Sequence, residues 1–237
     1  GSHVNLSMEF FHNMITDYIY NEKLASISGG DSLFLRSGEA YPVFKYRQTR
    51  ARLWGGEIRV DIHPHPIDRL HVEASLSFVQ AENLGGGGAS ITDSTRYLPL
   101  IPPLRTRGEC RYDLKTDGTK LANAFVKVGI EHYSAQDRFF AAYGTETRTP
   151  AYMLLNAGLG TDFLNKRGAT VFTLMLACTN ITDLAYQSHM NRLKYFDSDP
   201  NNATGRSGIY NMGRNVTVRI EFPFQRSLAK RRSEPAR

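Results

Sequence analysis

The feature that most constrains this chain is a two-residue alternation of apolar and polar side chains that continues over long segments. In 70–78, the apolar residues Leu70, Val72 and Phe78 alternate with polar neighbours, and 104–114 repeats the pattern with charged residues on its polar side. Successive side chains of a β-strand point to opposite faces, so each segment is predicted to be a strand with one apolar and one polar face. The sequence therefore predicts an all-β fold of antiparallel strands.

Nine segments of this kind are predicted, and most of them have 11 or more residues. Strands of soluble sheets usually have about 5–6 residues, whereas a tilted strand that crosses a bilayer needs about 9–11. Strand length thus favours a transmembrane β-barrel, and a membrane-spanning helix is excluded because no run of about 18 apolar residues exists. The predicted strands are Ser2–His12, Thr16–Leu24, Val43–His63, Leu70–Glu82, Pro102–Leu114, Leu121–Tyr133, Pro150–Phe163, Gly168–Cys178 and Ile209–Phe224.

The connections between these segments alternate between short and long. In chain order they contain 3, 18, 6, 19, 6, 16, 4 and 30 residues. Bacterial outer-membrane barrels have short periplasmic turns and long outer loops, so this alternation is what such a barrel requires. A soluble β-sandwich, the main alternative, gives no reason for all the long connections to lie at one end.

The two faces of the strands indicate which solvent each one meets. Apolar residues such as Met153, Leu155 and Leu159 are expected to contact lipid, whereas the charged face of 105–113 is expected to line a wet lumen. Aromatic residues near strand ends are predicted to form girdles at the membrane interfaces. These residues are Tyr18, Tyr20, Trp54, Tyr112, Phe163, Phe222 and Phe224.

Charge and cysteine usage exclude two other classes of protein. The chain has 237 residues and a formal net charge of +6, of which the tail 225–237 carries +4. A body with so little net charge, and without basic residues interleaved with stacking aromatics, does not indicate nucleic-acid binding. Cys110 and Cys178 lie too far apart in the sequence for a disulfide framework or a zinc site. The tail is predicted to be disordered because it offers almost nothing to bury.

Several segments, taken in order, resemble the C-terminal part of the β-barrel of TonB-dependent outer-membrane receptors. Leu98–Arg105 and Thr149–Tyr152 are similar to the starts of late barrel strands of that family. Asn180–Asp183 resembles the segment that opens the last outer loop, and 213–224 resembles the closing strand. The resemblance covers most of the chain from about Ala51 onwards.

The resemblance implies a fold, a location and partners. These receptors are 22-stranded barrels with a plug in the lumen, so residues 1–224 would be the last strands of such a barrel and 225–237 a basic tail. The plug and its TonB-contact segment would lie N-terminal to this chain. The resemblance implies a bacterial outer-membrane location, with lipid, lipopolysaccharide, the barrel-assembly machinery and the TonB complex as partners. Family members usually end on the aromatic residue of the closing strand, whereas 13 residues follow Phe224 here.

The function that follows from the resemblance is import of a scarce nutrient, with an iron chelate such as a siderophore or haem as the expected ligand. No catalytic set is found, so the chain is predicted not to be an enzyme, and no cofactor is expected. Arginine and tyrosine suit anionic or aromatic chelates, and histidine suits haem iron or a metal. The candidate ligand-binding residues at the long-loop end are Tyr97, His132, Tyr133, Tyr143, Arg148, His189, Arg192 and Tyr195.

A possible metal cluster lies at the opposite end of the strands. His63–Pro66, with Asp61, Asp68 and His71 nearby, contains residue types that suit transition metals. The predicted topology places this segment in a short turn, where proline simply ends the strand. The sequence therefore predicts no metal site. The remaining alternative for the whole chain is a soluble β-sandwich that binds a ligand or a carbohydrate.

Overall fold

The computed structural model describes residues 3–24, 26–28, 32–86, 91–144, 146–196, 201, 205 and 207–224. Eight strands form one sheet in the order β1-β4-β5-β6-β7-β8-β9-β10, and every neighbouring pair is antiparallel. Their bounds are Val4–Lys23 (β1), Phe44–Ile62 (β4), Leu70–Gly85 (β5), Arg105–Asp113 (β6), Leu121–Tyr133 (β7), Tyr152–Leu164 (β8), Thr170–Thr179 (β9) and Asn215–Glu221 (β10). The predicted all-β antiparallel fold is confirmed, and one continuous sheet is not the two packed layers that a β-sandwich requires.

The predicted number of strands in the sheet is wrong by one. Ser2–His12 and Thr16–Leu24 were expected to be two strands joined by a turn, but they form the single 20-residue strand β1. The pairing of β1 with β4 shifts register between Ile15 and Tyr18, which marks a β-bulge. A bulge adds one unpaired residue and interrupts the two-residue period, so it has the same sequence signature as a short turn.

The bulge in β1 also changes which side chains share a face. Below it, even-numbered residues such as Phe10 face the same side as Ile58 and Trp54 of β4. Above it, Tyr18 and Tyr20 pair with Thr49 and Arg47, so these tyrosines point to the opposite face from Phe10. A shift of one residue moves every following side chain to the other side of a sheet.

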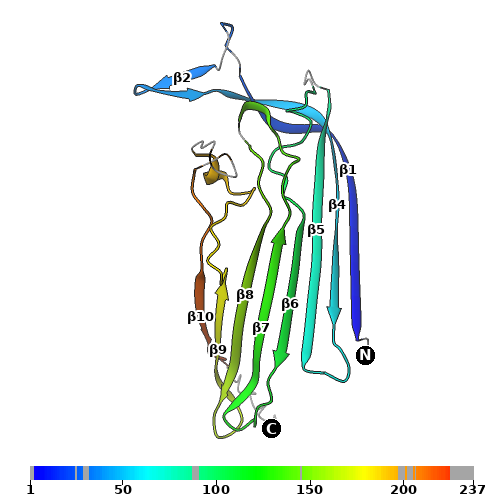
Figure 1. Ribbon diagram of the computed structural model, residues 1–237, viewed down its shortest axis with the longest axis vertical. Coiled ribbons are helices and arrows are strands. Elements are labelled where there is room, and N and C mark those ends of the chain that lie inside the picture. The colour runs from blue at the N-terminus through cyan, green and yellow to red at the C-terminus, as the bar shows by residue number, and fades with distance from the viewer. Residues whose placement is uncertain are drawn as a thin grey trace, which may run out of the picture.

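The short and long connections lie at opposite ends of the sheet (Figure 1). The turns after β4, β6 and β8 lie at the lower end of the view, and the long connections lie at the upper end. The first long connection contains a hairpin of β2 (Leu33–Arg36) and β3 (Glu39–Pro42), which projects sideways from the upper end (Figure 1). The predicted alternation is therefore confirmed for the seven connections between the eight strands.

One face of the sheet carries continuous rows of apolar side chains across the strands. A typical row joins directly opposed residues of all eight strands: Val4, Ile62, Val72, Cys110, Val128, Ala157, Cys178 and Val216. These side chains are left uncovered: Val128 is 60% exposed and Val216 is 66% exposed. An uncovered apolar area of this extent needs an apolar surrounding, as the predicted contact with lipid supplies.

Aromatic side chains border this apolar face at two heights. At the lower end, the rings of Phe163 and Phe172 stack with centroids 4.4 Å apart, and Phe222 lies 6.0 Å from Phe172. At the upper end, Trp54 and Phe78 meet edge to face at 5.6 Å. These positions agree with interfacial girdles.

The expectation that Tyr18 and Tyr20 belong to such a girdle is wrong. Tyr20 is only 6% exposed and packs against Phe140 of an upper connection, with ring centroids 6.0 Å apart. Tyr18 contacts the same buried cluster. The register shift in β1 turns both tyrosines under the long connections and away from the apolar face.

The opposite face carries charged residues that pair between neighbouring strands. The Lys127 Nζ lies 3.1 Å from the Glu109 carboxylate, and the Arg105 guanidinium lies 2.6 Å from the Glu131 carboxylate. Ion pairs in partial contact with water contribute little each, but they allow many charged residues to lie side by side on this face. The face is therefore suited to a water-filled or protein-filled lumen.

Only two short 3-10 helices occur in the described residues, Ala142–Gly144 (η1) and Arg192–Phe196 (η2). Within those residues no helix is both long and apolar enough to cross a membrane. The predicted disordered tail, Gln225–Arg237, lies outside the described residues, so its disorder stays a prediction.

Candidate ligand-binding site

The long connections pack on one another at the upper end of the sheet. Leu98, in the connection between β5 and β6, is 2% exposed and packs on Ala51 and Ala81 of the strands below. A second cluster joins Tyr20 to Phe140 and Ala142. Both clusters hold the connections against the strands, so the upper end has a defined shape.

A buried polar junction links three of these connections. Thr149 precedes β8, whereas His189 and Lys194 lie between β9 and β10, and none of the three is more than 1% exposed. The Lys194 ammonium donates to the Thr149 hydroxyl over 2.5 Å, and that hydroxyl lies 2.9 Å from His189 Nδ1. The Glu146 carboxylate accepts the N–H of Leu100 over 2.7 Å and lies 3.5 Å from His189 Nε2. The His189 Nε2 atom is buried and makes no hydrogen bond within the described residues. The other contacts of the junction fix the relative position of their segments.

Beside this junction lies a pocket of about 750 Å³ that is rich in aromatic side chains. It lies between the upper parts of β1 and β4 and the long connections. The lining side chains that are aromatic or positively charged are Tyr18, Tyr20, Lys23, Phe44, Tyr46, Phe140, Tyr143, Arg192 and Tyr195. We refer to this cavity as the upper pocket.

Tyr143 is held in the upper pocket by an unusual backbone conformation. Its φ of 63° lies in the left-handed region, which non-glycine residues rarely adopt, and its ring lies 5.7 Å from that of Phe140. Burial raises the pKa of the Tyr143 phenol, and the nearby Glu22 carboxylate raises it further. The phenol therefore stays protonated at neutral pH and can donate a hydrogen bond to an anionic group.

A stack of three tyrosines lies near the upper edge of the charged face. The rings of Tyr133 and Tyr152 are 4.7 Å apart and nearly parallel, at 17°, and Tyr186 continues the stack at 4.7 Å from Tyr152. The Arg105 guanidinium lies 5.5 Å from the Tyr133 ring centre, within the range of a cation–π contact. Burial also raises the pKa of Tyr186. The stack joins β6, β7 and β8 to the last long connection.

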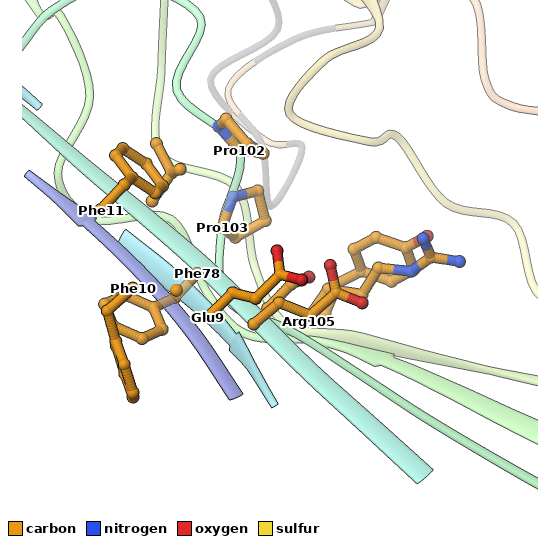
Figure 2. Close-up of a pocket in the computed structure, with 12 residues that line it drawn as sticks. Glu9, Phe10, Phe11, Phe78, Pro102, Pro103 and Arg105 are labelled. Atoms are coloured by element: carbon orange, nitrogen blue, oxygen red, sulfur yellow. The ribbon is translucent and has the colours of Figure 1, made fainter. Parts of the chain in front are cut away.

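A second pocket, of about 550 Å³, lies beside this stack and is shown in Figure 2. Its lining includes Glu9, Phe11, Pro103, Arg105 and Tyr133. In Figure 2, Phe11 and the two prolines lie on one side of the strands while Phe10 lies on the other. We refer to this cavity as the lumen pocket.

Paired glycines in β4 allow the aromatic rings of β1 to lie flat on the sheet. A Cβ added at Gly55 would lie 2.9 Å from the Phe11 ring, and one added at Gly56 would lie 2.6 Å from the Phe10 ring. Glycine is required at both positions because the rings occupy the space of a side chain. One ring thus covers each face, and Phe11 lines the lumen pocket.

The structure places four of the eight predicted ligand-binding residues in two pockets, three of them together. Tyr143, Arg192 and Tyr195 line the upper pocket, and Tyr133 lines the lumen pocket.

The other four predicted residues lie elsewhere. His189 is completely buried in the polar junction, and Arg148 forms an exposed ion pair with Asp137 at 2.6 Å. His132 lies on the apolar face, opposite Met153. Tyr97 pairs through its backbone with Glu82 at the upper end of β5.

Several residues of the pockets and of the tyrosine stack were not predicted. Arg105 and Tyr152 are direct cross-strand neighbours of the predicted Tyr133, so the alternation pattern contained the signal for the tyrosine stack. Tyr18 and Tyr20 were assigned to the girdle because the bulge in β1 gives no sequence signal distinct from a turn. Phe140 lies in a connection with no periodic pattern.

A comparison with protein-family models decides the identity of the fold. Residues 1–181 match the model described as "TonB dependent receptor-like, beta-barrel". The chain belongs to the TonB-dependent receptor family. Members of this family are transporters of the outer membrane of Gram-negative bacteria rather than enzymes. The predicted family is therefore confirmed.

Solved structures of TonB-dependent receptors share the fold. The copper transporter OprC superposes with a TM-score of 0.67 at 16% identity, over 94% of this chain and 29% of its own. The ferric-catecholate import receptor Fiu from E. coli K12 gives a TM-score of 0.52 at 18% identity, over 92% of this chain and 25% of its own. At such identities the likeness shows the fold alone. A sequence search of curated proteins finds no match.

The receptor chain is much shorter than these neighbours. It spans between a quarter and three tenths of their length, and its eight-stranded sheet is open, with β1 and β10 at its edges. Backbone groups at an open edge cannot be satisfied in lipid, so a closed barrel needs additional strands beside β1 and β10.

Proposed function

We propose that this chain is part of an outer-membrane active-transport receptor that imports an iron chelate, either a siderophore or haem, with energy supplied through TonB. The family supports outer-membrane transport in general. The choice of ligand class rests on the upper pocket.

The observation that carries the proposal is the combination of aromatic rings and cations in the upper pocket. Tyr143 offers a ring and a hydroxyl group, Tyr195 offers a ring while its hydroxyl oxygen is buried, and Arg192 offers a guanidinium. Planar anionic ligands such as catecholates and haem bind well to stacked rings and to guanidinium groups. The pocket also contains the Glu146 carboxylate, but this group accepts hydrogen bonds from the backbone N–H groups of Leu100 and Phe140.

The pocket is less suited to a bare metal ion. The described residues that line it include no histidine, cysteine or methionine, which are the side chains that bind copper and zinc most strongly. A chelate carries its own ligands to the metal and presents its organic surface to the protein. The upper pocket therefore gives no reason to propose copper, the metal in the name of OprC, as the ligand of this chain.

The lumen pocket and the charged face supply the next part of the proposed path. Arg105 and Tyr133 lie at the base of the tyrosine stack, where a ligand leaving the upper pocket would meet the lumen. Opening of the lumen would depend on a plug and a TonB-contact segment. We further propose contact with lipid and lipopolysaccharide through the apolar face, and insertion by the barrel-assembly machinery.

Binding to the complete purified receptor tests this proposal. We expect a ferric catecholate or haem to bind the wild type, and Arg192→Ala to weaken binding about tenfold or more, since a hydrogen bond to a charged group contributes about 1.5–3 kcal/mol. Tyr143→Ala should weaken binding as well. Arg148→Ala is the matched control, because this arginine pairs with Asp137 outside the pocket. If Arg192→Ala and Tyr143→Ala bound both chelates with the same affinity as the Arg148→Ala control, the assignment of the pocket would be refuted.

A further inference from the structure

Two histidines and a carboxylate meet at the lower end of the charged face, far from the upper pocket. His63 follows β4 and His71 lies at the start of β5, on either side of the short turn. The Nδ1 atoms of the two imidazoles lie 3.3 Å apart, and the ring planes are almost perpendicular, at 88°. The two nitrogens lie within hydrogen-bond distance of each other.

The spacing of the two nitrogens matches that of ligands on one metal ion. Imidazole nitrogens bind Zn²⁺ at about 2.0–2.1 Å, so two of them on a tetrahedral ion lie about 3.3–3.4 Å apart. Without a metal, one imidazole donates its Nδ1–H to the Nδ1 of the other. A metal ion would replace this proton and accept both lone pairs.

Asp113 of β6 orients His71 for this role. The Nε2 of His71 lies 2.9 Å from one Asp113 oxygen, and the Arg111 guanidinium holds the other oxygen at 2.9 Å. A carboxylate acceptor fixes the proton on Nε2 and leaves the Nδ1 lone pair of His71 available. Metal-bound histidines nearly always make this contact with a carboxylate, a carbonyl or a water.

The surroundings leave room for a hydrated cation. The cavity that contains His63 and His71 has a volume of about 330 Å³ and is also lined by Glu73, Glu109, Arg111 and Asp113. Among the described residues, no three histidine, cysteine or carboxylate side chains converge on one point, so water would complete the coordination. Arg111 compensates Asp113, and Lys127 and Arg107 compensate Glu109, so Glu73 is the lining carboxylate whose charge favours a cation in the cavity.

We propose that His63 and His71 form a binding site for a divalent transition-metal ion of the Zn²⁺, Ni²⁺ or Cu²⁺ class, with Asp113 as the residue that positions His71. The site joins the turn between β4 and β5 to β6. It lies at the opposite end of the strands from the upper pocket, so it is independent of chelate selection. This proposal differs from the sequence prediction, which weighed His63–Pro66 by its place in a turn and did not anticipate the pairing with Asp113.

Calorimetric titration of the complete, metal-free receptor with ZnCl₂ in detergent tests the site. We expect His63→Ala and His71→Ala each to remove one Zn²⁺ equivalent relative to wild type, and Asp113→Asn to weaken that equivalent by about 10–100-fold. His132→Ala is the matched control, because His132 lies on the apolar face, and it should bind as the wild type does. Equal Zn²⁺ stoichiometry and affinity in wild type, His63→Ala and His71→Ala would overturn the proposal.

A measurement on unaltered protein covers the case in which a histidine variant does not assemble. X-ray absorption of the wild-type receptor loaded with one equivalent of Zn²⁺ should show two imidazole nitrogens at about 2.0–2.1 Å. A spectrum without imidazole scattering would overturn the site. Neither experiment depends on iron-chelate binding, so its result stays separate from that of the transport proposal.

Discussion

Replacement of Thr149 by valine should release the upper connections from one another. The change keeps the shape of the side chain and removes a hydroxyl that accepts a hydrogen bond from the Lys194 ammonium and contacts His189 Nδ1. A hydrogen bond to a charged group contributes about 1.5–3 kcal/mol and a neutral one about 0.5–1.5 kcal/mol. The junction should therefore lose about 2–4.5 kcal/mol of stability against local opening.

Hydrogen exchange at single residues measures this loss. The amide of Gln136 donates to the Thr149 carbonyl over 2.9 Å, and the amide of Ile209 donates to the Leu193 carbonyl over 3.0 Å, so they report on the two connections. Where exchange follows local opening, each 1.4 kcal/mol changes the rate tenfold. Thr149→Val should raise both rates by about 30- to 2000-fold.

The control for this experiment is Thr217→Val, which alters an exposed threonine on β10 without touching the junction. Exchange at both amides should stay at the wild-type rate in this variant. Unchanged rates in Thr149→Val would show that the buried polar contacts do not hold the connections together, and that the apolar clusters alone do so.

Three further predictions concern the faces, the packing and the titration of the receptor. A spin label at Val128→Cys in β7 should be accessible to lipid-soluble oxygen, and a label at its neighbour Lys127→Cys should be shielded from oxygen. The opposite result would show that the assignment of the lipid and lumen faces is reversed. Gly160→Val should reduce barrel assembly, measured by heat-modifiable gel mobility, because an added Cβ would lie 2.7 Å from the Phe125 ring and overpacking costs about 1–3 kcal/mol. The raised pKa of Tyr143 implies a stabilising effect that is complete below pH 10 and lost as the pH rises through the raised value. Ionisation of the phenol changes its ultraviolet absorbance, so the difference between the pH titrations of wild type and Tyr143→Phe reports on Tyr143 alone. The midpoint of this difference should lie above the ordinary tyrosine pKa, and a midpoint at or below that pKa would contradict the prediction.

The period and spacing of the sequence were sufficient to predict the sheet. Val126, Val128 and Ile130 alternate with polar or small residues in β7, as in any strand with one apolar face. The length of the strands and the alternation of short and long connections then favoured a strand between lipid and lumen over a strand of a soluble sandwich. The same parity places His132 on the apolar face. The prediction that His132 binds the ligand rested on the chemistry of histidine and not on the position of His132 in the alternation.

The upper connections could not be predicted in the same way. Loop segments have no period, so the burial of His189 and Lys194 depends on contacts with Thr149, a residue 40 or more positions away. The bulge in β1 was read as a turn because both interrupt the alternation. Residue type alone predicts Tyr143, Arg192 and Tyr195 as ligand-binding, but the pocket they line depends on the three-dimensional packing of the connections.

Uptake of radiolabelled iron chelates by whole cells tests the central claim most directly. Cells in which the complete receptor is the only route for the chelate should accumulate a ferric catecholate or haem, and accumulation should cease when TonB is deleted while surface binding of the label remains. Arg192→Ala should lower uptake at limiting chelate concentration with unchanged receptor levels in the outer membrane. Uptake that continues without TonB, or accumulation of neither chelate by cells that display the receptor, would contradict the account.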